Sequence, residues 1–490
     1  MSGTQGTASK LAASPRGRID DSLWIDNERR IPSGDTYLVV DDSATGDEIA
    51  QVRSADADDV DRAFASARRA QQEWAQVSPT GRIAIVERAT QLLDDAKDDL
   101  AATMQAEVGT VQAQIYGSQV GLGLAALRYT TAAALPALEE KRTVGRSEVV
   151  YEPAGVVGAI TPWNYPLMQV ALKVAPALVS GSTVVLKPPS VAPLTAFLIG
   201  EAFAHAGLPA GALNIVCGSG GRVGNAIAGH RDADFVSFTG STGAGRLVAQ
   251  AAAKWGTRNS LELGGKSAAI VLDDHLIEPA VRHTIASCFA NAGQTCAALS
   301  RLIVPRHRLG EVEQVVRDVL SAVVVGDPRD PASTVGPLSN KGQQDAVLGY
   351  LRQAAESDGV RILADVRAEH LTRGWYVSPT VVVADDPWAP IVQEEVFGPV
   401  LVIQPADDEA HAVRLAEGTE FGLIARVWTH DDDRFTDVAR RLRVGGVIQS
   451  DTDTDWAAPF GGVKHSGHGR ERGVFGIEEY LVPKALQRRR

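Results

Sequence analysis

Cysteine is scarce in this chain, and long apolar runs are absent. The 490 residues include three cysteines, Cys217, Cys288 and Cys296. Three cysteines cannot make a disulfide framework, and no two of them have the spacing of a zinc site. We therefore expect no metal, a reducing compartment and a cytoplasmic location.

No segment predicts secretion or membrane insertion. Residues 108–127 lack charge but contain several Gln and Ser side chains, and residues 167–186 are interrupted by Lys173 and by the Gly181-Ser182 turn. Neither stretch is a continuous apolar span. Residues 1–18 are rich in Ser, Thr, Gly and Ala, lack an apolar core, and are predicted to form a disordered tail.

Basic residues are in the minority. Asp and Glu outnumber Lys and Arg by 60 to 48, which gives a formal net charge of −12. This excess argues against nucleic acid or an anionic membrane as the main partner. With 44% hydrophobic residues, a chain of this length has enough material for two or three globular domains.

The N-terminal part predicts short strands followed by helices. Apolar runs separated by turn residues between Leu23 and Val52 predict a small antiparallel unit. Residues 57–109 and 111–134 are helical in pattern. Gly121-x-Gly123-x-x-Ala126 superficially matches a dinucleotide fingerprint, but no strand precedes it, so helix–helix packing is favoured.

From residue 148 onward, apolar runs alternate with helical patterns. Residues 148–151 and 156–160 predict a strand–turn–strand, and this alternation is typical of a doubly wound parallel sheet. A second α/β unit follows Glu262, so the active site is expected between the two. The predicted strands are 183–186, 214–217, 235–238, 268–271, 302–304, 377–383 and 400–403, and the predicted helices are 193–206, 221–228, 242–254 and 310–323.

One thiol and one carboxylate stand out for their chemistry. Cys296 and Glu262 are each beside small residues, which would let a substrate and a flat cofactor ring approach. A thiol is a strong nucleophile as thiolate, and a carboxylate in an apolar setting can act as a general base. Cys217 and Cys288 lie in apolar segments and are interpreted as buried hydrophobic residues.

Six segments together resemble the signature motifs of the aldehyde dehydrogenase superfamily. They follow one another in the order expected for that family, and the resemblance spans Leu23 to Leu486. They are Thr161-Pro162-Trp163-Asn164-Tyr165-Pro166, Lys187-Pro188-Pro189-Ser190, the run from Phe238 to Gly245, Leu261-Glu262-Leu263-Gly264-Gly265-Lys266 with Asn291-Ala292-Gly293-Gln294-Thr295-Cys296, the run from Glu394 to Pro399, and the run from Pro459 to Glu471.

The resemblance implies a fold of two doubly wound α/β domains with a small β arm. Residues 19–130 and 153–263 would bind NAD or NADP, and residues 264–465 would form the catalytic domain. Residues 131–152 and 466–490 would form an oligomerisation arm and tail, as in a homodimer or homotetramer. The implied activity is oxidation of a small-molecule aldehyde to a carboxylic acid.

The resemblance also implies catalytic roles. Cys296 would attack the aldehyde, Glu262 would activate water against the thioester, and Asn164 with the Cys296 N–H would stabilise the oxyanion. Lys173 matches a lysine linked to proton relay, although a capping or ion-pair role is an equal alternative.

The implied cofactor site includes an unusual serine. Lys187 and Ser190 would meet the adenosine ribose, where NAD-preferring members often carry Glu; Ser190 removes that repulsion of a 2′-phosphate and predicts that NADP is tolerated. Glu395 and Phe397 would contact the nicotinamide ribose and ring. The remaining implied cofactor-binding residues are Ile160, Thr161, Pro162, Trp163, Phe238, Gly240, Ser241, Gly245 and Leu263.

The implied aldehyde pocket is mainly apolar. It lacks the basic anchor expected for a carboxylate-bearing aldehyde, so a neutral, apolar or aromatic aldehyde is the working hypothesis. Its residues would be Tyr165, Leu172, Thr295, Ala297, Trp456 and Phe460.

Three other functions compete with aldehyde oxidation. A CoA-acylating dehydrogenase usually lacks the base at Glu262, a non-catalytic protein has no need of Cys296 and Asn164, and a plain cysteine hydrolase has no need of the Gly240–Gly245 turn. His465 and His468 are three residues apart, but no third metal ligand is recognisable.

Overall fold

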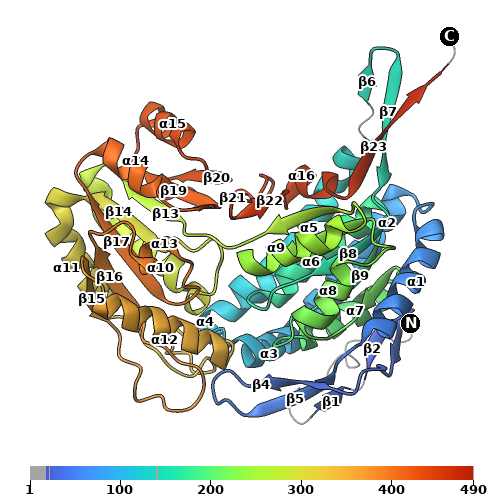
Figure 1. Cartoon of the computed structure of the whole chain (residues 1–490), viewed down its shortest axis with the longest axis horizontal. Helices are drawn as coiled ribbons and strands as arrows, with labels where there is room; N and C mark the ends of the chain where they lie inside the picture. The colour runs from blue at the N-terminus through green and yellow to red at the C-terminus, as the bar shows by residue number, and fades with distance from the viewer. Residues whose placement is uncertain (1–17, 21, 140–141, 489–490) are drawn as a thin grey trace, which may run out of the picture.

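The structure, a computed structural model, describes residues 18–20, 22–139 and 142–488. The predicted disordered tail, residues 1–18, lies outside the described residues except for its last residue, which begins a strand. The body consists of two lobes, each built on one large sheet, and a thin β arm projects from one of them (Figure 1).

The first lobe contains an eight-stranded sheet in the order β22-β12-β11-β8-β9-β10-β2-β3. The five central strands are parallel, and β2 and β22 add to them in antiparallel orientation. Residues of β8, β9 and β11 are all buried, as expected for strands covered on both faces. The strands are β2 (Leu23–Ile25), β3 (Glu28–Arg30), β8 (Val156–Ile160), β9 (Thr183–Lys187), β10 (Leu213–Ile215), β11 (Phe235–Thr239), β12 (Arg258–Glu262) and β22 (Gly467–His468).

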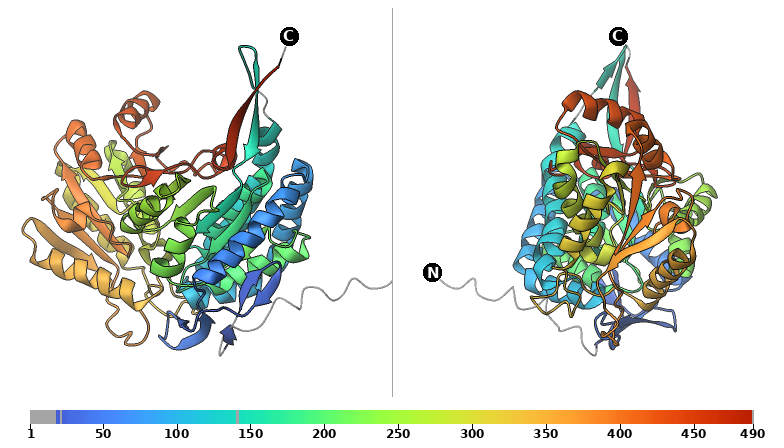
Figure 2. Two further views of the ribbon diagram at one scale, coloured as in Figure 1. Left: turned by 45° about the vertical axis from the view of Figure 1, so that its right-hand side comes forward. Right: turned by 90° about the vertical axis from the view of Figure 1, so that its left-hand side faces the viewer.

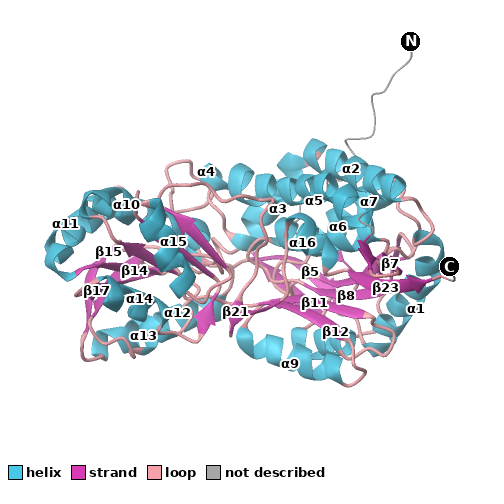
Figure 3. Cartoon of the chain, turned by 90° about the horizontal axis from the view of Figure 1, so that it is seen from above, coloured by secondary structure: helices cyan, strands magenta, loops and turns pink. Residues whose placement is uncertain are grey.

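Helices cover both faces of this sheet (Figure 3). One face packs against α1 (Ala57–Trp74), α8 (Asn225–Ala228) and α9 (Thr242–Ala253), with a short π-helix η2 (Gly220–Gly224) before α8. The other packs against α2 (Pro79–Asp95), α5 (Leu122–Glu139), α6 (Pro166–Ser180) and α7 (Leu194–His205), with α3 (Lys97–Val108) beside α7. The predicted βα alternation of this lobe is therefore confirmed.

The helical pattern of residues 111–134 is interrupted in the structure. A short α4 (Gln112–Gln114) and a π-helix η1 (Ile115–Gly121) precede α5. A Cβ on Gly123 would lie 2.3 Å from Cγ of Leu167, so this glycine permits α5 to contact α6 closely. Gly123 therefore serves helix packing, as predicted for this stretch.

The second lobe contains a seven-stranded sheet in the order β15-β16-β17-β14-β13-β19-β20, parallel except at β15. Helices α10, α11 and α12 pack on one face, and α14 and α15 on the other. The elements are β13 (Ala268–Val271), η3 (Asp274–Leu276), α10 (Ile277–Phe289), η4 (Ala290–Gly293), β14 (Arg301–Pro305), η5 (Arg306–Arg308), α11 (Leu309–Leu320), α12 (Lys341–Glu356), β15 (Val360–Asp365), β16 (Thr380–Ala384), α13 (Pro390–Gln393), β17 (Val400–Ala406), α14 (Glu409–Glu417), β19 (Ile424–Trp428), α15 (Asp432–Arg441) and β20 (Gly446–Gln449).

The predicted antiparallel unit of residues 23–52 is divided between two sheets. Strands β2 and β3 extend the eight-stranded sheet, whereas β4 (Tyr37–Asp41) and β5 (Glu48–Arg53) pair with each other, and β1 (Arg18–Asp20) pairs with β5. The prediction of one unit was wrong because the apolar runs show strands without showing their partners.

The projecting arm is a three-stranded antiparallel sheet (Figure 2). It contains β6 (Arg142–Val144), β7 (Ser147–Pro153) and β23 (Leu481–Gln487), so the C-terminal tail pairs with the arm of its own chain. The predicted strand–turn–strand over 148–160 therefore joins two sheets, because β7 belongs to the arm and β8 to the first lobe. Helix α16 (Gly473–Glu478) precedes β23, and β18 (Phe421–Gly422) pairs with β21 (Val463–Lys464).

Across the described parts of the chain, no helix combines the length and apolarity required to cross a bilayer.

Candidate active site

The carboxyl ends of four neighbouring strands bring the predicted motifs together. In the pairing register, Ile160 lies beside Lys187 and Phe238, and Thr239 lies beside Glu262. Strands β8, β9, β11 and β12 therefore end at one edge of the sheet. Ligands of open α/β sheets bind outside this edge, which agrees with the expected cofactor site.

A helix begins immediately beyond this edge. Gly240 follows β11 and donates its N–H to Glu262 O at 3.0 Å, and Ser241 caps α9 by accepting from Ala244 N at 3.3 Å. Gly245 is buried one turn into the helix. The positive end of α9 is thus directed to the same edge, as an anion-binding helix terminus requires.

The segment before Cys296 turns through an uncommon backbone conformation. Asn291, Ala292 and Gly293 have φ values of 51°, 54° and 78°, in the left-handed region. A Cβ on Gly293 would lie 2.1 Å from the carbonyl of Gly398, so only glycine fits there. Such strain persists where surrounding contacts determine the conformation.

Those contacts come from a buried polar cluster that connects the lobes. Gln119 of η1 and Asn291 each donate a side-chain hydrogen bond to Asn164 O at 2.9 Å. Thr110 donates to Asn291 Oδ1 at 2.7 Å and accepts from Gln119 at 2.9 Å. We call Thr110, Gln119, Asn164 and Asn291 the hinge cluster, because it fixes the Asn164 loop to the Cys296 loop.

Cys296 borders a cavity of about 290 Å³ together with residues of both lobes. Several predicted site residues meet there, from β8, β11, β12 and the segment before β17. Those that line this cavity are Pro162, Trp163, Asn164, Gly240, Ser241, Leu263, Cys296, Glu395 and Phe397.

The remaining predicted residues lie outside the lining of that cavity. Ile160, Thr161, Lys187, Phe238, Gly245 and Glu262 lie behind its wall at the strand ends and at α9, whereas Ser190 lies beyond β9. Lys173, Tyr165, Leu172, Thr295, Ala297, Trp456 and Phe460 also lie outside that lining.

Two polar oxygens in the cavity wall are orphaned. Asn164 Oδ1 and Thr239 Oγ1 are buried and have no hydrogen-bond partner among the residues that the structure describes. The Asn164 amide nitrogen donates to Gln294 O at 2.8 Å, two residues before Cys296. Buried polar atoms without partners are rare in folded proteins, so these atoms favour a polar ligand in the cavity.

The Cys296 side chain is a protonated thiol at neutral pH. Burial raises its pKa to about 12, and the charges of Glu395, Glu262 and Glu471 raise it further, whereas Arg472 lowers it. A thiol in this setting needs a proton acceptor before it can act as a thiolate.

Glu262 is buried, with neither carboxylate oxygen hydrogen-bonded within the described chain. Burial, and next the charge of Glu471, raise its pKa well above the ordinary value, while Lys173 and Arg470 lower it. A Cβ on Gly461 would lie 2.7 Å from Glu262 Oε1, so the lack of a side chain there lets the backbone pack closely against the carboxylate. Glu262 therefore has the environment of a general base with a raised pKa.

Lys173 forms a buried ion pair. Its Nζ lies 2.9 Å from Glu471 Oε1 and donates to Ser237 Oγ at 3.2 Å, and both charged side chains are almost completely buried. Tyr480 donates to the same Ser237 hydroxyl at 3.1 Å. The ion pair is thus present, and it lies close enough to Glu262 to affect that carboxylate.

Glu395 closes the cavity opposite the strand ends. Its Oε1 accepts from Gly265 N at 3.0 Å, and a Cβ on Gly264 would lie 1.9 Å from its Oε2. Burial raises its pKa to about 7. Phe397 meets Trp163 edge-on at 5.5 Å, so aromatic groups from both lobes flank the cavity.

Lys187 is the last residue of β9, and Ser190 lies three residues beyond it. Lys187 Nζ donates to Pro188 O at 2.7 Å, and burial lowers its pKa to about 8. Ser190 donates to Gly218 O at 3.0 Å. This chain therefore has the hydroxyl of Ser190 at the position where NAD-preferring members of the family often carry the carboxylate of Glu.

The predicted aldehyde pocket contains one basic group that sequence reasoning missed. Tyr165 and Thr295 are joined by a hydroxyl hydrogen bond of 2.7 Å, and Leu172 is buried nearby on α6. Trp456 and Phe460, however, pack against the guanidinium of Arg472. The signal available in the sequence was Arg472 itself, directly after the Pro459–Glu471 motif.

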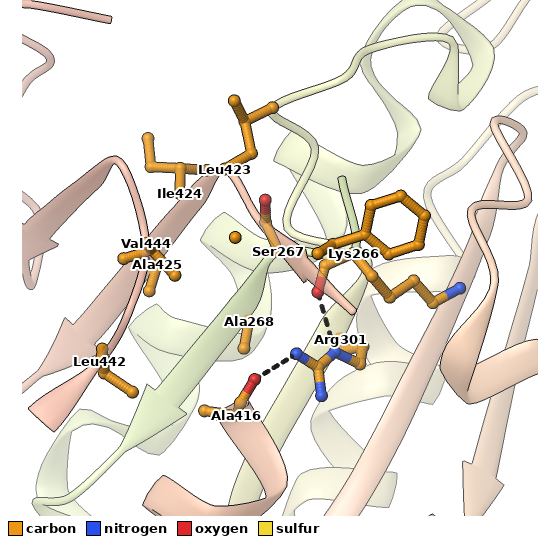
Figure 4. Close-up of a pocket in the computed structure, with 12 residues that line it drawn as sticks. Lys266, Ser267, Ala268, Arg301, Ala416, Leu423, Ile424, Ala425, Leu442 and Val444 are labelled. Carbon is orange, nitrogen blue, oxygen red and sulfur yellow. Dashed lines mark hydrogen bonds between the residues drawn. The ribbon is translucent and has the colours of Figure 1, made fainter. Parts of the chain in front are cut away.

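A second, much smaller pocket lies beside Lys266, Ser267 and Ala268, where β13 begins (Figure 4). Its volume is about 10 Å³, space for one water molecule, so it cannot hold an aldehyde. Arg301 donates there to Lys266 O at 2.9 Å and to Ala416 O at 2.7 Å. Burial lowers the pKa of Lys266 to about 7. Arg301 thus connects the start of β13 to the end of α14, and the pocket is too small for a substrate.

The residues around the main cavity fit a dinucleotide. The positive end of α9, the orphaned Thr239 hydroxyl and the Glu395 carboxylate provide complementary groups for phosphate and ribose hydroxyls. Among the described residues, no group of three or more His, Cys, Asp or Glu side chains could hold a metal ion.

Comparison with known proteins gives the family. The sequence profile of the aldehyde dehydrogenase family matches residues 31–486. The 3-succinoylsemialdehyde-pyridine dehydrogenase of a Pseudomonas species is 39% identical over 95% of this chain and 98% of its own length. A mutant of aldehyde dehydrogenase C from Pseudomonas syringae, complexed with NAD+ and octanal, has a TM-score of 0.93 and 39% identity, covering 96% of each chain.

A second solved structure, also complexed with NAD+, is similar to this chain. The aldehyde dehydrogenase of Mycobacterium tuberculosis has a TM-score of 0.93 and 37% identity over 96% of this chain and 99% of that one. The fold, the NAD or NADP cofactor and the enzyme class predicted from the motifs are thereby confirmed. This chain belongs to the aldehyde dehydrogenase family.

Proposed function

We propose that this enzyme oxidises an aldehyde to a carboxylic acid through a covalent intermediate on Cys296. The sulfur adds to the aldehyde carbon to form a thiohemiacetal, whose hydride leaves to NAD(P)+, and water then hydrolyses the thioester. The bound cofactor supplies the hydride acceptor. The net change consumes one aldehyde, one water and one oxidised cofactor for each acid formed.

Glu262 serves as proton acceptor in both halves of this reaction. Burial raises the pKa of Glu262 well above its ordinary value, which suits a proton acceptor, and Cys296 is a thiol before the aldehyde binds. The carboxylate form of Glu262 takes the thiol proton during attack, releases it to solvent, and later takes the proton of the hydrolytic water.

Asn164 stabilises the oxyanion that forms in both additions. Its amide nitrogen is already directed at the Cys296 loop, where it donates to Gln294 O. The Cys296 N–H is the second proposed donor. The hinge cluster holds the carbonyl of Asn164 in place, so the donor would be oriented before the aldehyde binds.

The observation that carries this proposal is the cavity that Cys296 shares with Asn164, Glu395 and the Gly240-Ser241 turn. A thiol nucleophile, an amide donor and a dinucleotide-binding helix end border the same space. A plain hydrolase has no use for the last of these, and a CoA-acylating enzyme has no use for Glu262.

Rapid mixing with octanal and NAD+ or NADP+ tests the proposal. The wild type should produce reduced cofactor continuously, and Cys296→Ser should produce almost none. Glu262→Gln should release up to one reduced cofactor for each active site in a slower burst than the wild type, because attack loses its proton acceptor, and should then slow further, because the thioester accumulates. A Glu262→Gln variant with normal steady-state turnover contradicts the assigned base.

We also infer that NADP is accepted. Ser190 bears no charge to repel a 2′-phosphate, and the pKa of Lys187 near 8 makes its cationic form dominant at pH 7. NADP use should therefore weaken relative to NAD as pH rises from 7 to 9, because Lys187 loses its charge. Activity with NAD alone at pH 7 contradicts this inference.

The substrate, the assembly and the location remain predictions. The solved relative holds octanal and the curated relative is named for 3-succinoylsemialdehyde-pyridine, so tails of different polarity deserve testing. A homodimer or homotetramer, a cytoplasmic location and the domain boundaries given above stay as sequence-based proposals. Light scattering of the purified protein measures the oligomeric state.

A further inference from the structure

Arg472 is held in an unusual conformation beside the proposed aldehyde site. Phe460 and Glu471 form a two-bond antiparallel bridge, with N···O distances of 2.8 and 2.7 Å, immediately before it. Arg472 then has φ 71° and ψ 156°, in the half of backbone space that favours glycine. A non-glycine residue in such a conformation carries strain, so its side-chain direction is imposed by the fold.

The Arg472 guanidinium lies against two aromatic rings. Its Cζ is 4.1 Å from the ring centre of Trp456 and 4.4 Å from that of Phe460, and Trp456 stacks in turn on Tyr129 of α5 at 6.0 Å. These contacts immobilise the cation between the Pro459 loop and the helices of the first lobe. Arginine held this way keeps its planar donor edge available for an acceptor.

The same guanidinium is short of acceptors. Its Nε is buried with no hydrogen-bond partner in the described part of the chain. The neighbouring carboxylate of Glu471 is directed instead to Lys173, at 2.9 Å. A buried N–H of a charged group without an acceptor is costly, and a ligand oxygen would remove that cost.

Arg472 is also close to the reacting groups. Its positive charge lowers the pKa of the Cys296 thiol, which burial and the charges of Glu395, Glu262 and Glu471 raise. Burial lowers the pKa of the Arg472 guanidinium itself, and the charges of Glu471, Cys296 and Glu262 raise it. Arg472 and Phe460 line a cavity of about 360 Å³, and the guanidinium lies on Trp456 and Phe460, which both belong to the predicted aldehyde pocket.

We propose that Arg472 recognises the substrate tail and selects aldehydes whose tails carry an oxygen acceptor, a ketone or a carboxylate. This proposal rests on the proposed function and defines the substrate class of that site. A cationic tail is disfavoured, because Arg472 already occupies the faces of Trp456 and Phe460 that would attract it and repels a second positive charge.

Matched aldehydes provide the test. At one length they are pentanal, 4-oxopentanal and succinate semialdehyde; at a longer one, heptanal, 6-oxoheptanal and 6-oxohexanoate. Betaine aldehyde supplies a cationic tail. The wild type should show a kcat/KM at least about tenfold higher for acceptor tails than for the plain alkanal at one of these lengths. Betaine aldehyde should be the poorest substrate.

Three variants separate recognition from support. Arg472→Met should lose the acceptor preference, so that the ratio of kcat/KM between an acceptor aldehyde and the plain alkanal of the same length falls close to one. Arg472→Lys should recover part of the preference, since it keeps the charge without the planar fork. Arg282→Met, at an exposed arginine on α10, is the matched control and should leave the preference unchanged.

Two results overturn the proposal. One is a wild type without acceptor preference at either length. The other is an Arg472→Met variant that either retains the preference or loses activity equally on all aldehydes, which indicates a supporting role only. Failure of the proposed function is distinct, because then neither the plain alkanals nor the acceptor aldehydes would support Cys296-dependent cofactor reduction.

Discussion

The buried Lys173–Glu471 pair provides a sharp test, because its two charges act on Glu262 in opposite directions. Lys173 lowers the pKa of Glu262 and Glu471 raises it. Removal of Lys173 should therefore move the acid limb of thioester hydrolysis to higher pH, since Glu262 must be deprotonated to act as base. Removal of the Glu471 charge should move the same limb to lower pH.

Stability should respond to the two variants in the same direction. The ion pair is 2.9 Å long with both side chains almost fully buried, so deletion of one partner strands the other charge. The expected cost is about 3–5 kcal/mol for Lys173→Met or Glu471→Gln at neutral pH, and less for a variant in which both are replaced. Thermal unfolding at a fixed scan rate ranks the stability of the wild type, the two single variants and the double variant.

The assay is the rate of the slow phase after the burst of cofactor reduction, measured across pH for the wild type, both single variants and Lys173→Met/Glu471→Gln. Opposite shifts in the single variants, with the double variant near the wild type, support an electrostatic role for Lys173. Shifts in the same direction refute the reasoning. A folded double variant that is inactive at every pH favours an obligatory proton relay through Lys173 instead.

Three further changes test other parts of the site. Gln119→Leu removes three buried hydrogen bonds from the hinge cluster, so kcat should fall about tenfold or more while cofactor affinity, measured by fluorescence titration, stays near the wild type. Ser190→Glu should shift the kcat/KM ratio towards NAD by at least about tenfold, and an unchanged ratio contradicts the ribose assignment. Gly264→Ala places a methyl group against Glu395 and should raise the KM for cofactor more than it lowers kcat; a larger effect on the aldehyde KM argues against this position of the ribose.

The strands that end at the active site could be predicted because both faces of their sheet are buried. Strand β8 is a continuous apolar run and β9 and β11 are mostly apolar, and each is followed by a Gly, Pro or Thr turn. Strand β12 was missed, since Arg258-Asn259-Ser260-Leu261-Glu262 is polar and becomes a strand through pairing with β11 and β22. Its last residue, Glu262, was found from the motif alone.

The hinge cluster could not be predicted from local pattern. Gln119 and Asn291 are 172 residues apart, and each is ordinary in its own segment. The sequence did show uncharged Gln residues within an apolar stretch, and the structure explains Gln119 as a buried hydrogen-bond donor. Arg472 was missed for a different reason: the motif before it favours a structural interpretation, and its stacking on Trp456 depends on tertiary contacts.

The raised pKa values of Cys296 and Glu262 limit how the proposed chemistry can begin. Cys296 is a thiol at pH 7, and transfer of its proton to the Glu262 carboxylate before an aldehyde binds would leave a thiolate in surroundings that disfavour charge. Attack on a bound aldehyde avoids a free thiolate, because the negative charge passes at once to the carbonyl oxygen, where Asn164 can donate. On this argument Cys296 stays unreactive without an aldehyde, and Arg472, which lowers the thiol pKa, favours reaction with those aldehydes that it also binds.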